Sequence, residues 1–256
     1  MLVASWNVNS IRVRLPQVLQ WTGAVRPDVV AIQETKTTDD AFPAAELEAA
    51  GYHVVYSGQK TYNGVALLTR EPPTDLVTDL ASMEDPQRRL IAATVGGIRV
   101  YNVYVPNGQA VGTDKFDYKL RWLAALRQQL ADELKAHREL LVAGDFNVAP
   151  DDRDVHDPAA WAGQVLVSDP ERHALSGLLD LGFRDTFRLF DQPEASFSWW
   201  DYRAAAFRRN RGLRIDLLLA STDMADRCTE STVDVAPRKW EKPSDHAPVL
   251  ARFDRQ

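Results

Sequence analysis

A short apolar run at residues 140–143 leads directly into residues that could do chemistry. The run has the length of a buried strand, and Gly144 ends it. Side chains two apart on an extended backbone point the same way, so Asp145 and Asn147 would share one face while Phe146 turns inward. On this stretch alone, an Asx-rich turn that closes a strand is the better interpretation. The rest of the chain repeats the arrangement, which favours a functional one.

Polar residues follow the predicted strands at ten positions. These are Asn7, Asn9, Glu34, Tyr104, Asn107, Asp145, Asn147, Asp216, Asp245 and His246. The exits of strands gather at one edge of a sheet, where ligands normally bind. Carboxylates and amides without cysteine make a hard, all-oxygen site that suits Mg²⁺ or Mn²⁺. Such a metal polarises a phosphoryl group. Histidine, asparagine and tyrosine side chains can donate hydrogen bonds to the negative charge that develops on the phosphoryl oxygens.

Each of these residues also has a purely structural explanation. Glu34 could be a solvated strand end, Asp216 an inward carboxylate bonded to backbone amides, and residues 244–246 a turn between prolines. Other chemistries fit the sequence less well, because it has neither a G-x-S-x-G elbow nor an H-E-x-x-H helix. Residues 58–61 resemble a phosphate loop with the wrong spacing. The ten positions together therefore predict metal-assisted hydrolysis, with an oriented, charged His246 beside Asp216.

The stretch at residues 197–214 combines aromatic and basic side chains. Trp199, Trp200 and Tyr202 come before the basic residues, which are Arg208, Arg209, Arg211 and Arg214. Aromatic faces stack on bases or line a sugar pocket, and arginines bind phosphates bidentately. The alternative is a core tryptophan pair beside a solvated loop. We expect one tryptophan to be core and the basic patch to bind nucleic acid.

The composition sets the limits of the fold and its partners. The 256 residues carry a formal charge of 30 − 36 = −6, which argues against a strongly basic coat but allows a local basic patch. The one cysteine, Cys228, forbids an internal disulfide and indicates a reducing compartment. Neither a signal peptide nor a membrane-spanning run is visible. We expect a cytoplasmic protein without membrane contact, monomeric, with one domain over residues 1–256.

The apolar patterns predict strands mixed with helices. Strands are expected at residues 2–6, 29–32, 52–56, 65–69, 90–95, 98–103, 140–143, 215–220, 232–235 and 248–253. Helices are expected at residues 43–50, 116–137 and 168–181, and from about Leu15 to Val25 with Pro16 in the first turn. Hairpin signals beside strand–helix alternation favour a layered α/β domain with sheets covered by helices, rather than a doubly wound parallel sheet.

Six motifs in order along the chain carry a family resemblance. They are W-N-V-N-S-I-R at 6–12, Q-E-T-K at 33–36, N-x-Y-x-P-N-G at 102–108, G-D-F-N at 144–147, R-G-L-R-I-D-L-L-L-A-S at 211–221 and K-P-S-D-H-A-P at 242–248. Together they resemble the exonuclease III type of class II abasic-site endonuclease, in the endonuclease/exonuclease/phosphatase superfamily. The resemblance implies a four-layered α/β sandwich with two central mixed β-sheets flanked by helices.

The resemblance also implies roles for the polar residues. Glu34 would be the principal Mg²⁺ ligand, with Mn²⁺ as a substitute, assisted by Asn7 and Asp245. Asp145 would position or deprotonate the attacking water, and Asn147 would bind water and phosphate. The remaining three residues would stabilise the scissile phosphate: Tyr104, and His246 supported by Asp216.

Double-stranded DNA with abasic sites or blocked 3′ ends is the substrate that the resemblance implies. Lys115 would lie near the DNA, Asn107 would lie where a side chain enters the duplex, and Trp199 with Leu213 would line the pocket for the base-less sugar. Cleavage would fall 5′ to the abasic site, with 3′→5′ exonuclease and 3′-phosphatase activities besides. Two departures, a short region at 150–170 and a variable loop at 109–114, bear on exonuclease strength and duplex penetration.

Two other functions stay open at this point. One is a nonspecific nuclease or another phosphoesterase of the same superfamily, against which the stretch at residues 197–214 argues for DNA. The other is a non-catalytic DNA-binding protein on the same scaffold, against which the complete set of acidic and histidine positions argues.

Overall fold

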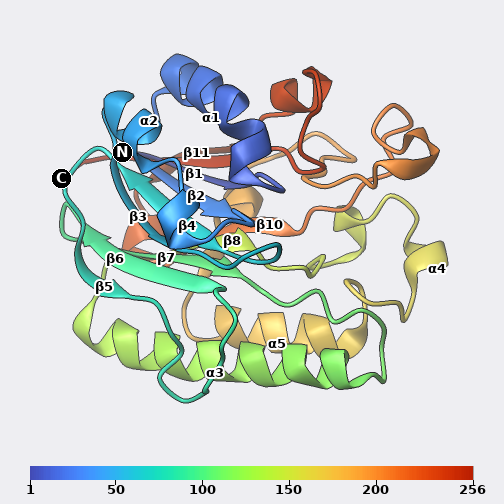
Figure 1. Cartoon of the computed structure of the whole chain (residues 1–256). Helices are drawn as coiled ribbons and strands as arrows, with labels where there is room; N and C mark the ends of the chain where they lie inside the picture. Colours follow the sequence, from blue (N-terminus) through green and yellow to red (C-terminus); the bar gives the residue numbers. More distant parts are fainter. Residues whose placement is uncertain (256) are drawn as a thin grey trace.

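Two six-stranded sheets form the centre of the computed structural model, which describes residues 1–255 (Figure 1). The strand order of the first sheet is β11 (Cys228–Val233), β12 (Val249–Phe253), β1 (Leu2–Asn7), β2 (Val29–Gln33), β4 (Val65–Thr69) and β3 (His53–Ser57). The order of the second is β5 (Thr74–Val77), β6 (Leu90–Val95), β7 (Ile98–Tyr104), β8 (Leu140–Asp145), β10 (Asp216–Ala220) and β9 (Arg184–Asp185). Both sheets mix parallel and antiparallel pairs.

Helices cover the outer face of each sheet, which completes four layers (Figure 1). The first sheet is covered by α1 (Ile11–Val25) and α2 (Ala44–Ala49), and the second by α3 (Asp114–Ala136) and α5 (Asp169–Leu179). Two short helices are α4 (Pro158–Trp161) and α6 (Thr222–Ala225), and short 3₁₀ turns lie at 39–41, 152–154, 186–189, 203–205 and 236–239. The predicted four-layered α/β sandwich is confirmed. Among the described residues, no helix is both long and apolar enough to span a membrane.

The alternation of side chains along each strand explains the layers. On β1, Val3 belongs to the core between the two sheets, whereas Ala4 and Trp6 belong to the core under α1. On β8, Ala143 faces the other sheet and Val142 packs toward α3. Since both faces of these strands are buried, their sequences read as continuous apolar runs.

The strand directions bring the predicted polar residues to one edge. β1 and β2 are parallel, and so are β7 and β8. A hydrogen bond joins Asn7 at the end of β1 to Asp145 at the end of β8, so all four strands end at the same side. β10 is antiparallel to β8 and β12 to β1, so these two strands begin at that side. Tyr104 and Asp216 are both register partners of Asp145.

A buried pair of amides joins the two sheets beneath this edge. Gln33 Nε2 donates to Asn102 Oδ1 at 2.8 Å, and Asn102 Nδ2 donates to the carbonyls of Ile32 and Ala66, each at 2.8 Å. Gln33 and Asn102 have no exposed surface. Buried polar groups are costly unless hydrogen-bonded, so this bridge fixes how the sheets stack.

The predicted starts of α1 and β11 are wrong, and two edge strands were not predicted. α1 begins at Ile11 and contains Pro16, because the N–H groups of Ser10 and Ile11 donate to the carbonyls of Glu34 and Thr35 and so anchor its start. The strand expected at 232–235 begins at Cys228 instead. The edge strands β5 and β9 were not predicted, because they are short and mostly exposed. The start predicted for α5 is confirmed by a capping box between Ser168 and Glu171.

Candidate active site

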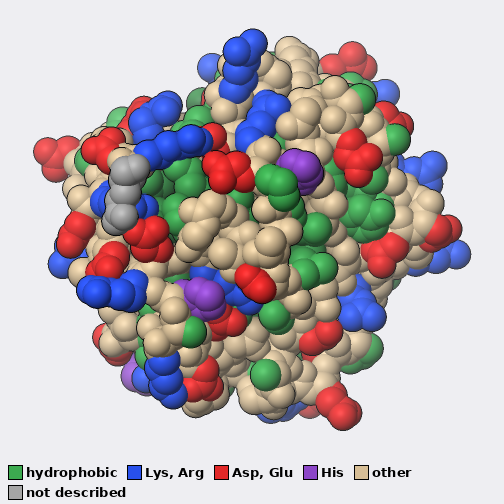
Figure 2. All heavy atoms as spheres, turned by 90° about the vertical axis from the view of Figure 1, so that its left-hand side faces the viewer, with side chains coloured by type: hydrophobic (Ala, Val, Ile, Leu, Met, Phe, Trp, Pro, Cys, Tyr) green, Lys and Arg blue, Asp and Glu red, His purple; other side chains and the backbone are tan. Residues whose placement is uncertain are grey.

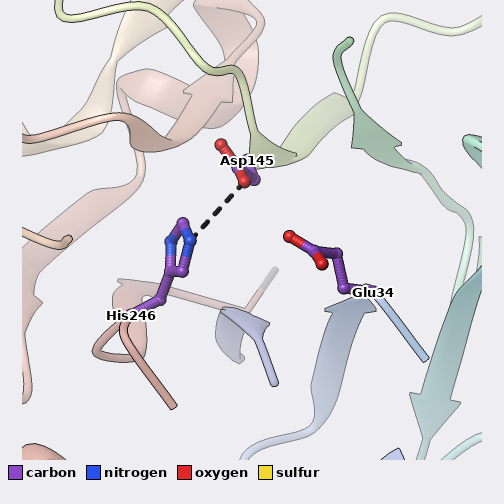
Figure 3. Close-up of side chains that lie close together, drawn as sticks. All are labelled: Glu34, Asp145 and His246. Carbon is purple, nitrogen blue, oxygen red and sulfur yellow. Dashed lines mark ion pairs between the residues drawn. The ribbon is translucent and has the colours of Figure 1, made fainter. Parts of the chain in front are cut away.

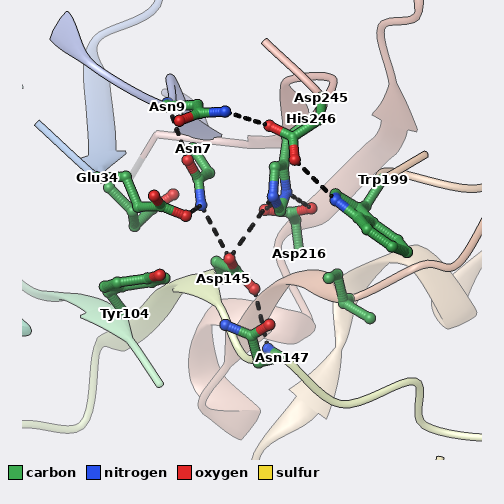
Figure 4. A network of polar contacts seen from close by, with 12 residues as sticks. Asn7, Asn9, Glu34, Tyr104, Asp145, Asn147, Trp199, Asp216, Asp245 and His246 are labelled. Atoms are coloured by element: carbon green, nitrogen blue, oxygen red, sulfur yellow. Dashed lines mark hydrogen bonds and ion pairs between the residues drawn. The ribbon is translucent and has the colours of Figure 1, made fainter. Parts of the chain in front are cut away.

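The amide of Asn7, at the end of β1, joins two carboxylates at the centre of the site (Figure 4). Its Nδ2 donates to Glu34 Oε1 at 2.8 Å and to Asp145 Oδ2 at 2.9 Å. Asn7 has no exposed surface, and Asp145 is also buried. Because both donor bonds go to carboxylates, Asn7 fixes the separation between Glu34 and Asp145.

The imidazole of His246 lies between two aspartates from adjacent strands. Its Nδ1 is 2.8 Å from Asp216 Oδ2, and its Nε2 is 3.8 Å from Asp145 Oδ2. Burial opposes the charged ring, but Asp216 and then Asp145 outweigh it and raise the pKa of His246 to about 10. The ring is therefore a cation near neutral pH, and a doubly protonated imidazole donates hydrogen bonds but does not ligate a metal.

Ser198 completes the support of this histidine. Its Oγ donates to Asp216 Oδ2 at 2.6 Å and accepts from the N–H groups of Ile215 and Asp216, each at 3.0 Å. The hydroxyl therefore holds the Asp216 carboxylate against the ring. Sequence reasoning missed Ser198, because a serine between two aromatic residues carries no distinctive signal.

The environment of Asp145 suits a group that accepts a proton from water. Burial, opposed by His246 and assisted by Asp216, raises the pKa of Asp145 to about 7. A general base works best when its pKa lies near the working pH. The second oxygen, Oδ1, accepts from the N–H of Asn147 at 2.9 Å, which fixes the carboxylate on β8.

Glu34, Asp145 and His246 form a compact group at the sheet edge (Figure 3). One ligand-type atom from each lies within 4.8 Å of the others. Since His246 is charged, the atoms that suit a metal are the oxygens of Glu34 and Asp145, which are hard donors. Lys36 Nζ lies 2.8 Å from Glu34 Oε2, so a cation is already beside this carboxylate. The residues fit a divalent metal bound by oxygen.

Asp245, a predicted metal ligand, lies on the other side of this group, and both its oxygens accept hydrogen bonds. Oδ1 accepts from Asn9 Nδ2 and Oδ2 from Trp199 Nε1, each at 3.0 Å (Figure 4). Burial opposes ionisation, but the charge of His246 and these donors hold the pKa of Asp245 below its usual value. A hydrogen bond joins Asn7 to Glu34, and metal ligation by Glu34, Asn7 and Asp245 stays a prediction.

Asn147 and Asn107 meet at the edge, although Asn147 does not lie on the strand. β8 ends at Asp145, and Asn147 has a left-handed φ of 49°. The expectation that both share a strand face is therefore wrong, whereas Phe146 does turn into the core. Asn147 Nδ2 donates to the carbonyl of Val105 at 2.9 Å, and Asn107 Nδ2 donates to Asn147 Oδ1 at 3.2 Å. The loops after β7 and β8 are thereby joined.

Tyr104 ends β7 beside the two carboxylates (Figure 4). Burial and the charges of Glu34 and Asp145 raise the pKa of Tyr104 well above its ordinary value. The phenol therefore keeps its proton and can donate to an anionic oxygen.

A groove of about 670 Å³ extends from these residues across the surface. Glu34, Tyr104, Asn107 and Lys115 line it, and the contact of Lys115 with DNA stays a prediction. The lining residues that were not predicted to bind substrate include Lys36, Tyr62 and Arg89. Only the tertiary structure places them here, although Lys36 stands in a motif quoted above. On the face of the molecule where both termini lie, away from the ends of β1, β2, β7 and β8, acidic and basic side chains are interspersed (Figure 2).

The aromatic and basic stretch divides as the sequence analysis expected, with one correction. Trp200 is buried in a small core, whereas Trp199 is half-buried and reaches Asp245. The side chains of Arg208, Arg209 and Arg211 are exposed, and the structure of residues 1–255 gives them no ion pair. Arg214 does not belong to this patch, because it is buried against Asp154 and Asp185. Leu213 packs with Trp199 but has no exposed surface, so its place in a sugar pocket stays a prediction.

The fold is a two-sheet sandwich, and carboxylates, amides and a charged histidine lie at its edge. This combination is typical of metal-dependent phosphoester hydrolases. The sequence profile of the Endonuclease/Exonuclease/phosphatase family matches residues 4–246, and the chain belongs to that family.

Proteins of known structure and curated sequence agree with this membership. The chain is 38% identical to exodeoxyribonuclease III of Haemophilus influenzae, over 97% of this chain and 98% of the relative. It is 48% identical to the 3′ phosphatase NExo from Neisseria, solved with a product DNA hairpin, with full coverage of both chains and a TM-score of 0.98. It is 40% identical to an AP endonuclease from Archaeoglobus fulgidus, again with full coverage of both chains and a TM-score of 0.95. The predicted family is confirmed.

Proposed function

We propose that this protein is a metal-dependent DNA repair phosphodiesterase that removes blocked 3′ ends and cleaves the backbone 5′ to abasic sites. The observation that carries the proposal is the bridge from Asn7 to Glu34 and Asp145, with the His246 cation beside Asp145. Two carboxylates and a cation thus lie within a few ångströms of one another, which supports the assignment of a base and a metal site. We further propose that the metal is Mg²⁺, with Mn²⁺ as a substitute, and that the protein acts as a cytoplasmic monomer.

The chemistry at the scissile bond follows from the positions of the side chains. Asp145 takes a proton from a water molecule whose oxygen forms the new bond to phosphorus. The bond from phosphorus to the 3′ oxygen breaks, and that oxygen keeps the electron pair and takes a proton from solvent. Abasic-site cleavage then leaves a 3′-hydroxyl, and the same bond breaks when a 3′-phosphate is removed.

The negative charge of the transition state meets fixed donors. The His246 cation, the Tyr104 phenol and the Asn147 amide are suitable donors for the equatorial oxygens. A metal bound at Glu34 would neutralise phosphoryl charge and stabilise the leaving oxygen. Asn7 keeps Asp145 and Glu34 at a fixed separation, so that the base and the metal site work on the same phosphate.

DNA as the substrate is supported by the basic surface and by the relatives. The exposed residues Arg208, Arg209 and Arg211 stand free to contact phosphates, and Lys115 lines the groove beside Glu34. The 3′ phosphatase and the AP endonuclease named above support 3′-end removal and abasic cleavage, respectively. The exodeoxyribonuclease III relative supports a 3′→5′ exonuclease activity.

Three labelled duplexes test the proposal, each with Mg²⁺ and with EDTA. One carries a tetrahydrofuran abasic analogue, one a 3′-phosphate, and one an intact blunt end. We expect hydrolysis of all three with Mg²⁺ and none with EDTA. A rate on intact plasmid equal to the rate on the abasic duplex would favour a nonspecific nuclease. DNA binding without metal-dependent turnover would favour a non-catalytic protein.

A further inference from the structure

A lysine is completely buried beneath the two asparagines of the site. Neither Lys119 on α3 nor its partner Glu171 at the start of α5 has exposed surface. A buried ammonium is costly unless each of its three N–H groups has an acceptor. Lys119 is the one lysine that the structure of residues 1–255 buries in this way. Its charge therefore needs an explanation beyond packing.

The Lys119 ammonium has three acceptors, one on each of three segments that are far apart in the sequence. It donates to the carbonyl oxygen of Asn107 at 3.1 Å, to that of Asn147 at 2.5 Å, and to Glu171 Oε1. Asn107 follows β7, Asn147 follows β8, and Glu171 belongs to the first turn of α5. One cation thus fixes the main chain of both loops that carry the asparagines.

Glu171, the acidic partner of this ion pair, also accepts several hydrogen bonds besides the one from Lys119. The Glu171 carboxylate accepts from the N–H of Leu166 at 3.0 Å, from the N–H of Ser168 at 3.2 Å, and from the Ser168 hydroxyl. Since its acceptors are in use, the carboxylate cannot turn away from the ammonium. The loop that enters α5 is thereby joined, through Glu171 and Lys119, to the two asparagine loops.

The stem of Lys119 adds a steric contact to these hydrogen bonds. A Cβ at Gly108 would lie only 3.0 Å from Lys119 Cδ, and Gly108 has a φ of +90°. A larger residue would push the loop after Asn107 away from the lysine. The close approach of this glycine therefore keeps Asn107 on its acceptor position.

We propose that Lys119 is a positioning residue of the reaction, which holds the main chain of Asn107 and Asn147 so that their amides face the reacting phosphate. Asn147 in turn donates its N–H to Asp145, so the same support reaches the base. The inference rests on the proposed function for the identity of the substrate. A positioning role predicts lost turnover with little change in KM, because small displacements of aligned groups slow the chemical step.

The test uses a double variant, Lys119→Met with Glu171→Gln. Replacing a buried ion pair by neutral residues of similar size is often tolerated, so we expect a folded protein. We expect kcat on the 3′-phosphate duplex to fall about 30-fold to 100-fold, with KM within about threefold of the unaltered protein. Lys135→Met is the matched control, because Lys135 lies on the same helix and its ion pair with Asp132 is exposed. This control should keep full kcat.

Wild-type kcat in the folded double variant would overturn the positioning role, as would a loss no larger than its unfolded fraction. If the double variant does not fold, Lys119→Arg decides the question, because it keeps the charge and the donors. We expect Lys119→Arg to lose about tenfold in kcat at constant KM. A raised KM with unchanged kcat would contradict the proposal. Absence of turnover by the unaltered protein on every DNA substrate would instead contradict the proposed function.

Discussion

Asp145 and Asp216 are register partners on the antiparallel strands β8 and β10, and the charged imidazole of His246 lies between their carboxylates. The pairing gives the two aspartates different environments. Asp216 is held by the Ser198 hydroxyl and keeps the imidazole charged, whereas Asp145 is buried beside Glu34 and has a raised pKa. One carboxylate therefore orients the cation, and the other is suited to take a proton from water.

Replacing the base should remove turnover and keep the fold. We expect Asp145→Asn to lower kcat on the abasic duplex by about a thousandfold or more. The nearly isosteric amide removes a carboxylate that burial disfavours but loses one of the two accepted hydrogen bonds, so thermal stability should change little. Single-turnover kinetics and a melting curve measure the two effects, with the exposed Asp132→Asn as control. Full activity in Asp145→Asn would contradict its assignment as the base.

Loss of Asp216 should move the alkaline limit of activity. Asp216 is the strongest cause that raises the pKa of His246 to about 10, so the cation is lost as pH rises through that value. In Asp216→Asn the pKa of His246 falls, and the alkaline limb of the kcat/KM profile should shift to lower pH.

The same pair contributes to stability with a defined sign. Because the folded pKa is raised above the ordinary value of 6.5, the contribution is complete below that pH and is lost as pH rises through about 10. The difference in free energy of unfolding between the unaltered protein and Asp216→Asn should therefore shrink at high pH. An alkaline limb that stays in place in Asp216→Asn would show that the histidine charge does not limit the reaction.

Glu34 should set the metal requirement. We expect Glu34→Gln to raise the Mg²⁺ concentration for half-maximal activity by about tenfold or more, because it removes the anionic donor at the site. Direct Mn²⁺ binding, measured by electron paramagnetic resonance, should weaken in parallel. Lys36→Met is the informative comparison, since it removes the cation 2.8 Å from Glu34 and should tighten metal binding. Unchanged Mn²⁺ affinity in Glu34→Gln would move the metal site elsewhere.

The exposed arginines should contribute through phosphate contacts. We expect Arg209→Ala to weaken DNA binding similarly for all sequences and to reduce the slope of log affinity against log salt by about one. Fluorescence anisotropy over a salt series gives this slope. Arg252→Ala is a control, because Arg252 is exposed on β12 and pairs with Glu230. An equal slope for Arg209→Ala and the unaltered protein would remove the patch from the DNA interface.

The amide bridge between the sheets should matter for stability more than for turnover. Asn102→Ala would remove the side-chain donor to the carbonyls of Ile32 and Ala66 and the link to Gln33 in the other sheet, whose Nε2 would keep only its bonds within its own sheet. We expect it to lower the free energy of unfolding by about 2 to 3 kcal/mol. Urea denaturation measures this, with Gln128→Ala on the exposed face of α3 as control. A loss below about 0.5 kcal/mol would mean that other contacts fix the stacking.

Much of the site was predictable because it follows strand ends. Asn7, Glu34, Tyr104, Asp145 and Asp216 come at the ends or starts of apolar runs, and strand direction brings such positions to one edge within each sheet. The order of motifs along the chain also fixed the family. The sequence predicted that one of the two adjacent tryptophans is core, and the structure shows that it is Trp200.

Other features depend on contacts between distant segments. Arg214 looks like part of a basic patch in the sequence, yet Asp154 and Asp185 bury it. Asn147 lies beyond the strand, in a left-handed conformation that alternation along a strand does not describe. Lys119 lies on the buried, mostly apolar face of α3, and the sequence does not show why a lysine is placed there. The reason is its three acceptors, which come from other segments of the chain.

The sequence by itself determined the buried central strands, their polar exits and the oxygen-rich chemistry, because local alternation and residue type set these. Only the tertiary structure decided which residues at the strand ends are in contact, which charges are buried, and which groups are protonated. Burial and partner distance control both the pKa and the direction of each hydrogen bond, and these depend on residues far apart in the chain. Asn7 and Asp145 are 138 positions apart, and their 2.9 Å contact exists only when the two sheets pack.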